Sequence, residues 1–211
     1  ERTGRLNYNY YSENRLNPVS CLLLAFLLTT GRRLKEASSL TWDRFKQGEN
    51  PRLELAKTKT SKKNNKLVFK LGDEAVNILQ LIERDRLNNP ESYFYFPIGD
   101  ERNKYIFPSK AYGRKIKGGT SKNLYLLDPG ATWGSALKMG GVARHMKIHS
   151  TRHSFATNFY RETKDLKALA EALGTTEAQA SKYAKLDESV VVGINKIKFF
   201  KDEKPILKQV N

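Results

Sequence analysis

The sequence has few of the features that mark secreted, disulfide-built or membrane proteins. Its 211 residues include one cysteine, Cys21, so no internal disulfide can form, and we expect a buried thiol in a reducing cytoplasm. The longest apolar run, residues 21–28, has eight residues, whereas crossing a bilayer takes about 20. The chain begins Glu-Arg-Thr-Gly, without the apolar segment of a secretory signal. These absences exclude the membrane, secreted and disulfide-scaffold classes and predict a cytoplasmic protein.

Acidic residues are missing from two long segments. Residues 57–66 hold five lysines and residues 102–127 hold seven Lys or Arg, and neither segment has an acid. Over the whole chain, 38 Lys and Arg against 22 Asp and Glu give a formal net charge of +16. Charge that serves only solubility would not explain why whole segments lack acids. Because such an excess repels itself, a polyanionic partner is the natural explanation, and the sequence predicts binding to DNA or RNA.

The periodicity and turn signals predict a mostly helical chain with one small sheet. Asn17 and Pro18 are typical of a helix start and Gly31 of its end. Further helices are expected at residues 34–40, 73–87, 131–139, 151–161, 164–173 and 177–184. Short strands are expected near residues 42–45, 52–59 and 66–71. Residues 92–108 are irregular with one short strand, and the basic stretch to Pro129 is a long surface loop with some helix. The predicted fold class is α+β, mainly α, with a small antiparallel three-stranded sheet at one edge.

Three motifs carry residues suited to chemistry on a phosphate. The first is Thr-Gly-Arg-Arg-Leu-Lys-Glu at residues 30–36. Its Arg33 and Glu36 stand three apart at the start of a new helix, so the carboxylate can orient the guanidinium. Taken alone this signal is weak, because an arginine at a helix start is usually just exposed.

The second motif is His-Ser-Thr-Arg-His at residues 149–153. His149 and Arg152 stand three apart across a predicted helix N-terminus, where free backbone amides also favour an anion. The imidazole can donate a hydrogen bond or act as a base near neutral pH, and the guanidinium can clamp a phosphate. The third motif is Leu-Gly-Thr-Thr at residues 173–176, followed by Tyr183 on the last predicted helix.

Together these residues resemble the tyrosine recombinases, the phage-type integrases. The likeness consists of Thr-Gly-x-Arg-x-x-Glu, a lysine-bearing hairpin at residues 57–66, His-x-x-Arg-His, and Leu-Gly before a tyrosine. It spans about residues 17–186 in the family's order and spacing, and we expect this part to be the helical catalytic domain. Residues 1–16 are expected to be a linker or N-terminal extension and residues 187–211 a C-terminal tail. No segment of this sequence resembles the family's N-terminal helical DNA-binding domain, so we expect the chain to be the catalytic half, beginning in the interdomain linker.

The resemblance implies an enzyme that cleaves and rejoins double-stranded DNA by site-specific recombination, in the integration, excision or inversion of a mobile element. Tyr183 would attack a backbone phosphate and leave a 3′-phosphotyrosine and a free 5′-hydroxyl. His149 would accept the phenol proton, and Arg33 and Arg152 would hold the charge that develops on the phosphate. Because the bond energy is retained, neither ATP, a metal nor another cofactor is implied, and no small-molecule substrate is expected.

A hairpin lysine would protonate the leaving 5′-oxygen. Lys57 is chosen because residues 53–58 resemble the family's strand-lysine-threonine segment most closely. Lys59 is the rival, since it lies two residues on and therefore on the same face of the strand. The alternative is that this lysine-rich turn only grips phosphates without sequence preference.

One position departs from the family pattern. Thr175 follows Leu-Gly where the family usually has histidine or tryptophan, and Tyr183 comes eight positions later, one fewer than usual. The loss of one such contact costs about 1–3 kcal/mol of transition-state stabilisation, which weakens the chemistry without abolishing it. Two other functions remain open. One is DNA relaxation like that of a type IB topoisomerase, which uses the same kind of nucleophile, and the other is DNA binding by a regulator with a decayed recombinase fold, for which Thr175 is the only support in the sequence.

Two further expectations concern metals and assembly. His145, His149 and His153 fall four apart and would form a metal-binding stripe if one helix ran through all three, although the family pattern has a break there. We expect no metal site. The family commonly exchanges C-terminal segments within a tetramer on DNA, so we expect a homotetramer on DNA in which the residues after Ala184 dock on a neighbouring protomer.

Overall fold

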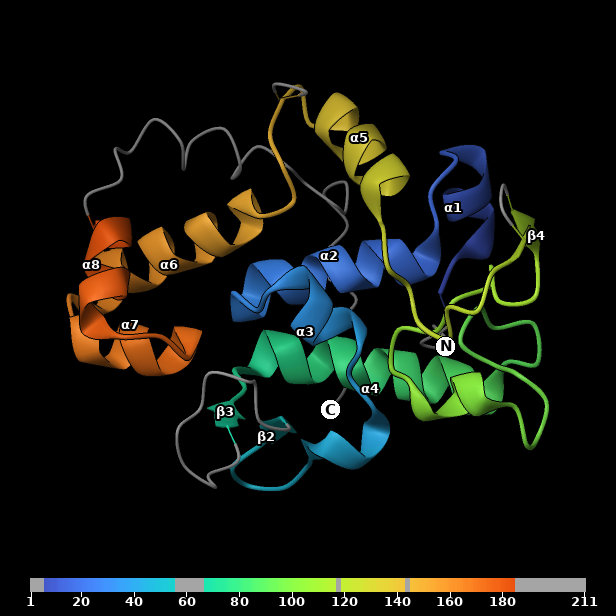
Figure 1. Ribbon diagram of the computed structural model, residues 1–211, viewed down its shortest axis with the longest axis horizontal. Coiled ribbons are helices and arrows are strands. Elements are labelled where there is room, and N and C mark those ends of the chain that lie inside the picture. The colour runs from blue at the N-terminus through green and yellow to red at the C-terminus, as the bar shows by residue number, and fades with distance from the viewer. Residues whose placement is uncertain (1–5, 56–66, 117–118, 143–144, 185–211) are drawn as a thin grey trace.

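The computed structural model describes residues 6–55, 67–116, 119–142 and 145–184, and within these ranges the chain forms eight α-helices and two small sheets (Figure 1). The helices are α1 (Tyr8–Glu13), α2 (Pro18–Thr30), α3 (Leu34–Ser38), α4 (Asp73–Asn88), α5 (Gly130–Met139), α6 (Ser150–Thr163), α7 (Leu166–Leu173) and α8 (Glu177–Ala184). The strands are β1 (Phe45–Lys46), β2 (Arg52–Leu55), β3 (Leu67–Lys70), β4 (Lys115–Ile116) and β5 (Gly119–Thr120), and two 3-10 helices are η1 (Trp42–Arg44) and η2 (Glu101–Lys104). None of the helices in these ranges is both long and apolar enough to span a membrane.

Helix α2 is the centre of the core. The side chain of Asn17 accepts a hydrogen bond from the Ser20 amide at its start, and Gly31, with φ of +62°, ends it in the left-handed conformation. These are the caps that the sequence predicts. Ten of its 13 residues are buried, Cys21 among them. Figure 1 shows α2 crossing the middle of the molecule, where it contacts α3, α4, α5 and α6.

The main sheet has the order β1-β2-β3 with antiparallel pairing, which confirms the expected fold class. Leu53 of β2 pairs with Phe69 of β3, and both side chains are buried in the main core. The strand predicted at residues 42–45 is wrong in its position, because residues 42–44 form η1 and the strand begins at Phe45.

The physical reason for this shift is a pairing that lies far away in sequence. The carbonyl of Leu40 accepts a hydrogen bond from the Ile106 amide, and Thr41 forms a β-bridge with Tyr105. The chain therefore runs first beside residues 105–106 and has to turn before it can pair with β2. The tip of the lysine hairpin, residues 56–66, lies outside the described residues.

Two segments have more regular structure than the sequence predicts. Helix α1 forms inside the expected linker, where the hydroxyl of Tyr8 donates to the Asp85 carboxylate and its ring stacks on Tyr93. In the basic stretch before Pro129, the described residues form the β4–β5 hairpin instead of the helical turns expected there. Gly113 and Gly119 in this stretch have φ of +78° and +138°, conformations that interrupt a helix.

Candidate active site

The loop after α2 holds Arg33 at the surface in a defined orientation. Arg33 is the residue before α3, and its Nη1 atom donates to Oε1 of Glu36 at 2.8 Å. The Arg33 amide donates to the other carboxylate oxygen of Glu36 at 3.2 Å. The Arg33 side chain remains 52% exposed. The pairing predicted from the spacing of three is confirmed, and it leaves the guanidinium open to a ligand.

Gly31 brings this loop against α6. An added Cβ atom at Gly31 would lie 2.4 Å from Cδ1 of Phe155 and 3.1 Å from a methyl group of Leu173. Both the positive φ of Gly31 and this close approach therefore require glycine. The residue that ends α2 also determines how closely the Arg33 loop packs on α6.

Arg152 joins this loop to the turn that precedes α8. It is 2% exposed, its Nη1 atom donates to the Gly31 carbonyl at 2.6 Å, and its Nη2 atom donates to the Leu173 carbonyl at 3.0 Å. Both acceptors lie at helix C-termini, where the helix dipole is negative and attracts a cation. A guanidinium has five N–H donors, so Arg152 keeps donors beyond the two that hold it in place.

His149 lies beside both arginines. It is exposed and immediately precedes α6. Although much of the side chain is exposed, the part of it that the protein shields from water lowers the pKa of His149 below its usual 6.5, and the positive charges of Arg152 and Arg33 lower this pKa further. A lowered pKa keeps the imidazole neutral at neutral pH, and a neutral imidazole can accept a proton. Three of the predicted residues, from two distant segments of the chain, are thus brought together.

Tyr183 reaches the same region from α8. Its half-buried ring packs against a small apolar cluster between α6, α7 and α8 that includes Leu169 and Leu173. The ring of His153 lies 5.1 Å from that of Tyr183 and 4.9 Å from that of His149, measured between centroids. The three rings therefore form a continuous row, and Figure 1 shows α6, α7 and α8 packed together at one end of the molecule.

Strand β3, which follows the lysine hairpin, lies close to the turn between α7 and α8, although Lys57 and Lys59 themselves fall outside the described residues. Strand β3 contacts α7, and a Cβ atom at Gly174 would lie 2.7 Å from Cε1 of Phe69. The strand that follows the hairpin is therefore anchored next to the turn between α7 and α8.

Thr175 occupies the position where the family pattern has histidine or tryptophan. Its hydroxyl donates to the side-chain amide oxygen of Gln179 on α8, and its backbone N–H donates to the Ala170 carbonyl at 2.9 Å. The hydroxyl thus makes its hydrogen bond within the protein and links the turn before α8 to the first part of that helix.

The three histidines are not arranged as one helical stripe. Helix α6 begins at Ser150, and His145 lies in a turn before it. Among residues 6–55, 67–116, 119–142 and 145–184, no group of three His, Cys, Asp or Glu side chains is placed to hold a metal ion.

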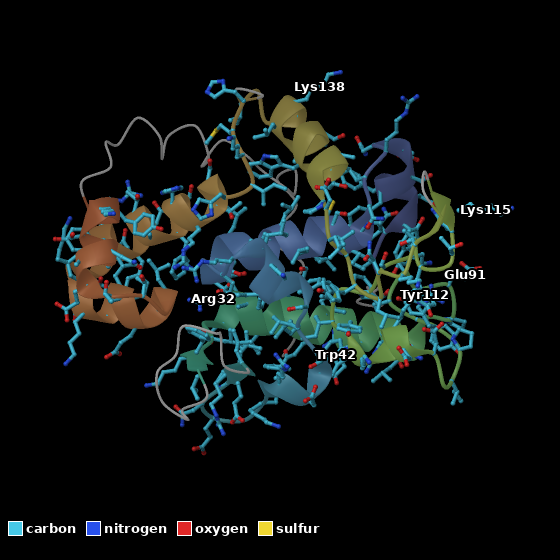
Figure 2. The ribbon with its side chains drawn as sticks, in the orientation of Figure 1. Arg32, Trp42, Glu91, Tyr112, Lys115 and Lys138 are labelled. Atoms are coloured by element: carbon cyan, nitrogen blue, oxygen red, sulfur yellow. The ribbon has the colours of Figure 1, made fainter. Side chains whose placement is uncertain are left out.

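Arg32 is a residue of this region that the sequence did not single out. It is 2% exposed, and Figure 2 shows it between the end of α2 and the group formed by α6, α7 and α8. Its Nη2 atom donates to the Ala172 carbonyl, one residue before the Leu173 carbonyl that Arg152 uses. The arginine doublet at residues 32–33 is the signal that could have drawn attention to it.

The comparisons with known proteins concern the family and the fold. The sequence model of the Phage integrase family matches residues 8–189. A structure of the XerH site-specific recombinase bound to difH substrate in a pre-cleavage complex matches with a TM-score of 0.55 and 19% identity, over 90% of this chain and 47% of that chain. The XerA recombinase matches with a TM-score of 0.56 and 18% identity, over 90% of this chain and 62% of that one.

A Tn1549 transposon integrase fragment in complex with a circular intermediate DNA has a TM-score of 0.51 and 15% identity, over 83% of this chain and 58% of that chain. The protein thus spans about half of XerH and somewhat more of the other two. A search of functionally curated proteins found no match. Since the family match covers most of the sequence and the fold agrees with it, the chain belongs to the phage integrase family of tyrosine recombinases.

Proposed function

We propose that this protein is a site-specific recombinase that cleaves and rejoins DNA through a 3′-phosphotyrosine intermediate formed on Tyr183. The observation that carries the proposal is the bridge made by Arg152, whose guanidinium bonds to Gly31 and Leu173. This bridge holds the Arg33 loop next to the turn before α8. The bridge thus supports a single site to which the Arg33 loop and the helix with Tyr183, which are far apart in sequence, both contribute.

The residues have complementary roles in the proposed reaction. The oxygen of Tyr183 attacks phosphorus, a new P–O bond forms to the tyrosine, and the bond from phosphorus to the 5′-oxygen breaks. A free phenol has a pKa near 10, so its proton needs an acceptor, and His149 is suited to this role because its lowered pKa keeps it neutral. Lys57 protonates the departing 5′-oxygen, with Lys59 as the alternative donor.

The two family arginines act on the phosphate in different ways. Arg33 is exposed and its carboxylate partner Glu36 orients it, so a bound phosphate can meet it directly. Arg152 is buried to 2% exposure, and it acts mainly through its nearby positive charge, which favours the extra negative charge of the transition state. One phosphodiester is exchanged for another, so the reaction as written needs neither ATP nor a metal.

Double-stranded DNA is the proposed partner, and a homotetramer on DNA is the proposed assembly. The net charge of +16 favours a polyanion, and the XerH structure was solved with its difH substrate. We further propose residues 17–186 as the catalytic domain and residues 187–211 as a tail that docks on a neighbouring protomer.

A covalent trapping experiment tests the proposal. The protein is incubated with a pool of duplexes that have a randomised core and a nick near it, so that cleavage releases a short fragment and traps the adduct. The adducts are isolated under denaturing conditions and sequenced, which also identifies the target site. We expect a covalent adduct with the unchanged protein and none with Tyr183→Phe.

Tyr160→Phe is the matched control, because Tyr160 packs against the same small apolar cluster as Tyr183. It should form the adduct at the normal rate. Adduct formation that survives in Tyr183→Phe would refute the assigned nucleophile. Binding of the duplexes without any adduct would mean that the protein is a DNA-binding protein and not a recombinase.

A further inference from the structure

Arg32 is a buried arginine that contacts three separate elements. Its Nε atom donates to the Thr30 carbonyl at the end of α2 at 3.4 Å, and its Nη2 atom donates to the Ala172 carbonyl near the end of α7. Its guanidinium carbon lies 3.6 Å from the centroid of the Phe69 ring in β3. A single side chain therefore links the ends of two helices to the sheet.

This arrangement is unfavourable for a residue that serves only to fill space. No acid forms an ion pair with Arg32 among the described residues, and its buried Nη1 atom has no hydrogen-bond partner there. Burial lowers the pKa of Arg32 to about 9, so the side chain still carries its charge at pH 7. Burying an unpaired charge is costly, and an apolar side chain of similar volume would avoid this cost. The contacts of Arg32 therefore point to a role beyond packing.

The contacts of Arg32 lie where the chain turns toward Tyr183. Arg32 and Arg152 hold neighbouring carbonyls, those of Ala172 and Leu173, in the last turn of α7. The next residue, Gly174, has φ of +62°, and a Cβ atom there would lie 3.5 Å from Nη1 of Arg32 and 2.7 Å from Phe69. Helix α8 with Tyr183 starts three residues later. The position of this turn decides where the tyrosine is placed.

We propose that Arg32 is a positioning residue for strand cleavage, which sets the location of α8 and thereby of the Tyr183 oxygen relative to Arg152. It acts through the Ala172 carbonyl and the Gly174 turn, and it does not contact DNA because it is 2% exposed. This inference rests on the proposed function. Misplacement of a reacting group by about 1 Å can cost on the order of 100-fold in rate, which sets the size of the expected effect.

Arg32→Met tests the inference, because methionine fills part of the space without donating hydrogen bonds. The measurement is the single-turnover rate of adduct formation on the duplex recovered by trapping, at saturating protein and below the melting temperature of every variant. We expect the rate to fall at least about 30-fold, while the affinity for the same duplex stays within about threefold. Arg32→Lys keeps the charge but not the planar fork, and it should also be slow.

Arg86→Met is the matched control. Arg86 stacks on Trp42 at 4.7 Å, donates to the Asn103 carbonyl at 3.0 Å and has a buried Nε atom without a partner among the described residues. These contacts resemble those of Arg32, but both partners, Trp42 and Asn103, lie outside α7. We expect Arg86→Met to cleave at the normal rate, and it should be destabilised less than Arg32→Met because Arg86 is only half-buried.

A second substrate separates the tyrosine from the hairpin lysine. A duplex with a 5′-phosphorothiolate at the scissile position has a thiolate leaving group that needs no proton, so a misplaced lysine no longer matters. Because Arg32 is inferred to place Tyr183, the defect of Arg32→Met should persist on this duplex. Full recovery on it would overturn the inference.

Normal cleavage by Arg32→Met or Arg32→Lys, or an equal loss in Arg86→Met, would also overturn the inference while leaving the proposed function intact. Absence of any adduct with the unchanged protein would instead overturn the proposed function, and the inference with it.

Discussion

Replacement of Gly31 by alanine should destabilise the protein for two reasons that can be measured separately. The first is conformational, since Gly31 has φ of +62° and an L-residue in this region costs about 1–2 kcal/mol. The second is steric, since the new Cβ atom would lie 2.4 Å from Cδ1 and 2.8 Å from Cγ of Phe155. Overpacking of a core typically costs about 1–3 kcal/mol. We therefore expect Gly31→Ala to lower the free energy of unfolding by about 2–5 kcal/mol.

Gly141→Ala is the control that isolates the steric part. Gly141 has φ of +63°, nearly the same as Gly31, but a Cβ atom there would meet no described atom within 4 Å. This variant should lose only the conformational part, about 1–2 kcal/mol. Urea unfolding followed by circular dichroism gives the free energy of each variant, provided that the slope with denaturant is unchanged.

A second background tests the identity of the clashing group. Phe155→Ala removes both atoms, Cδ1 and Cγ, that the new Cβ atom would meet most closely, so Gly31→Ala made in this background should cost much less than in the unchanged protein and approach the cost of Gly141→Ala. If Gly31→Ala were as mild as Gly141→Ala in the unchanged protein, the reasoning from close approach would be refuted. Because the Gly31 carbonyl holds Arg152 at 2.6 Å, we also expect Gly31→Ala to slow adduct formation.

Two further predictions concern protonation and the N-terminal helix. The pKa of His149 is lowered from 6.5, so the rate of cleavage should be constant near pH 7 and fall only below pH 6.5, where the imidazole takes up a proton. Arg33→Met removes one of the positive charges that lower this pKa, so it should move the fall in rate to higher pH. A fall centred above pH 6.5 in the unchanged protein would contradict the assignment of His149. Tyr8→Phe removes a donor to the buried Asp85 carboxylate, which should cost about 1–3 kcal/mol in urea unfolding. Tyr10→Phe should have little effect, because that hydroxyl bonds to none of the described residues, and equal losses in the two variants would argue against the Asp85 bond.

Local patterns predicted the helices and part of the site because their causes are local. Asn17, Pro18 and Gly31 act on the backbone within a few residues, so the bounds of α2 follow from the sequence. The Arg33–Glu36 pair is equally local, since a spacing of three on a helix is a matter of geometry. The order of the motifs was sufficient to identify the family.

Tertiary contacts decided the features that the local pattern could not. Arg32 and Arg33 are chemically identical neighbours, yet one is buried under α7 and the other is exposed, because the carbonyl of Ala172 and the ring of Phe69 come from segments far away in sequence. The 3-10 turn at residues 42–44 depends in the same way on pairing with residues 105–106. Short-range backbone preferences depend on a few adjacent residues, whereas the burial of a charged side chain depends on which parts of the protein, distant in sequence, pack against it.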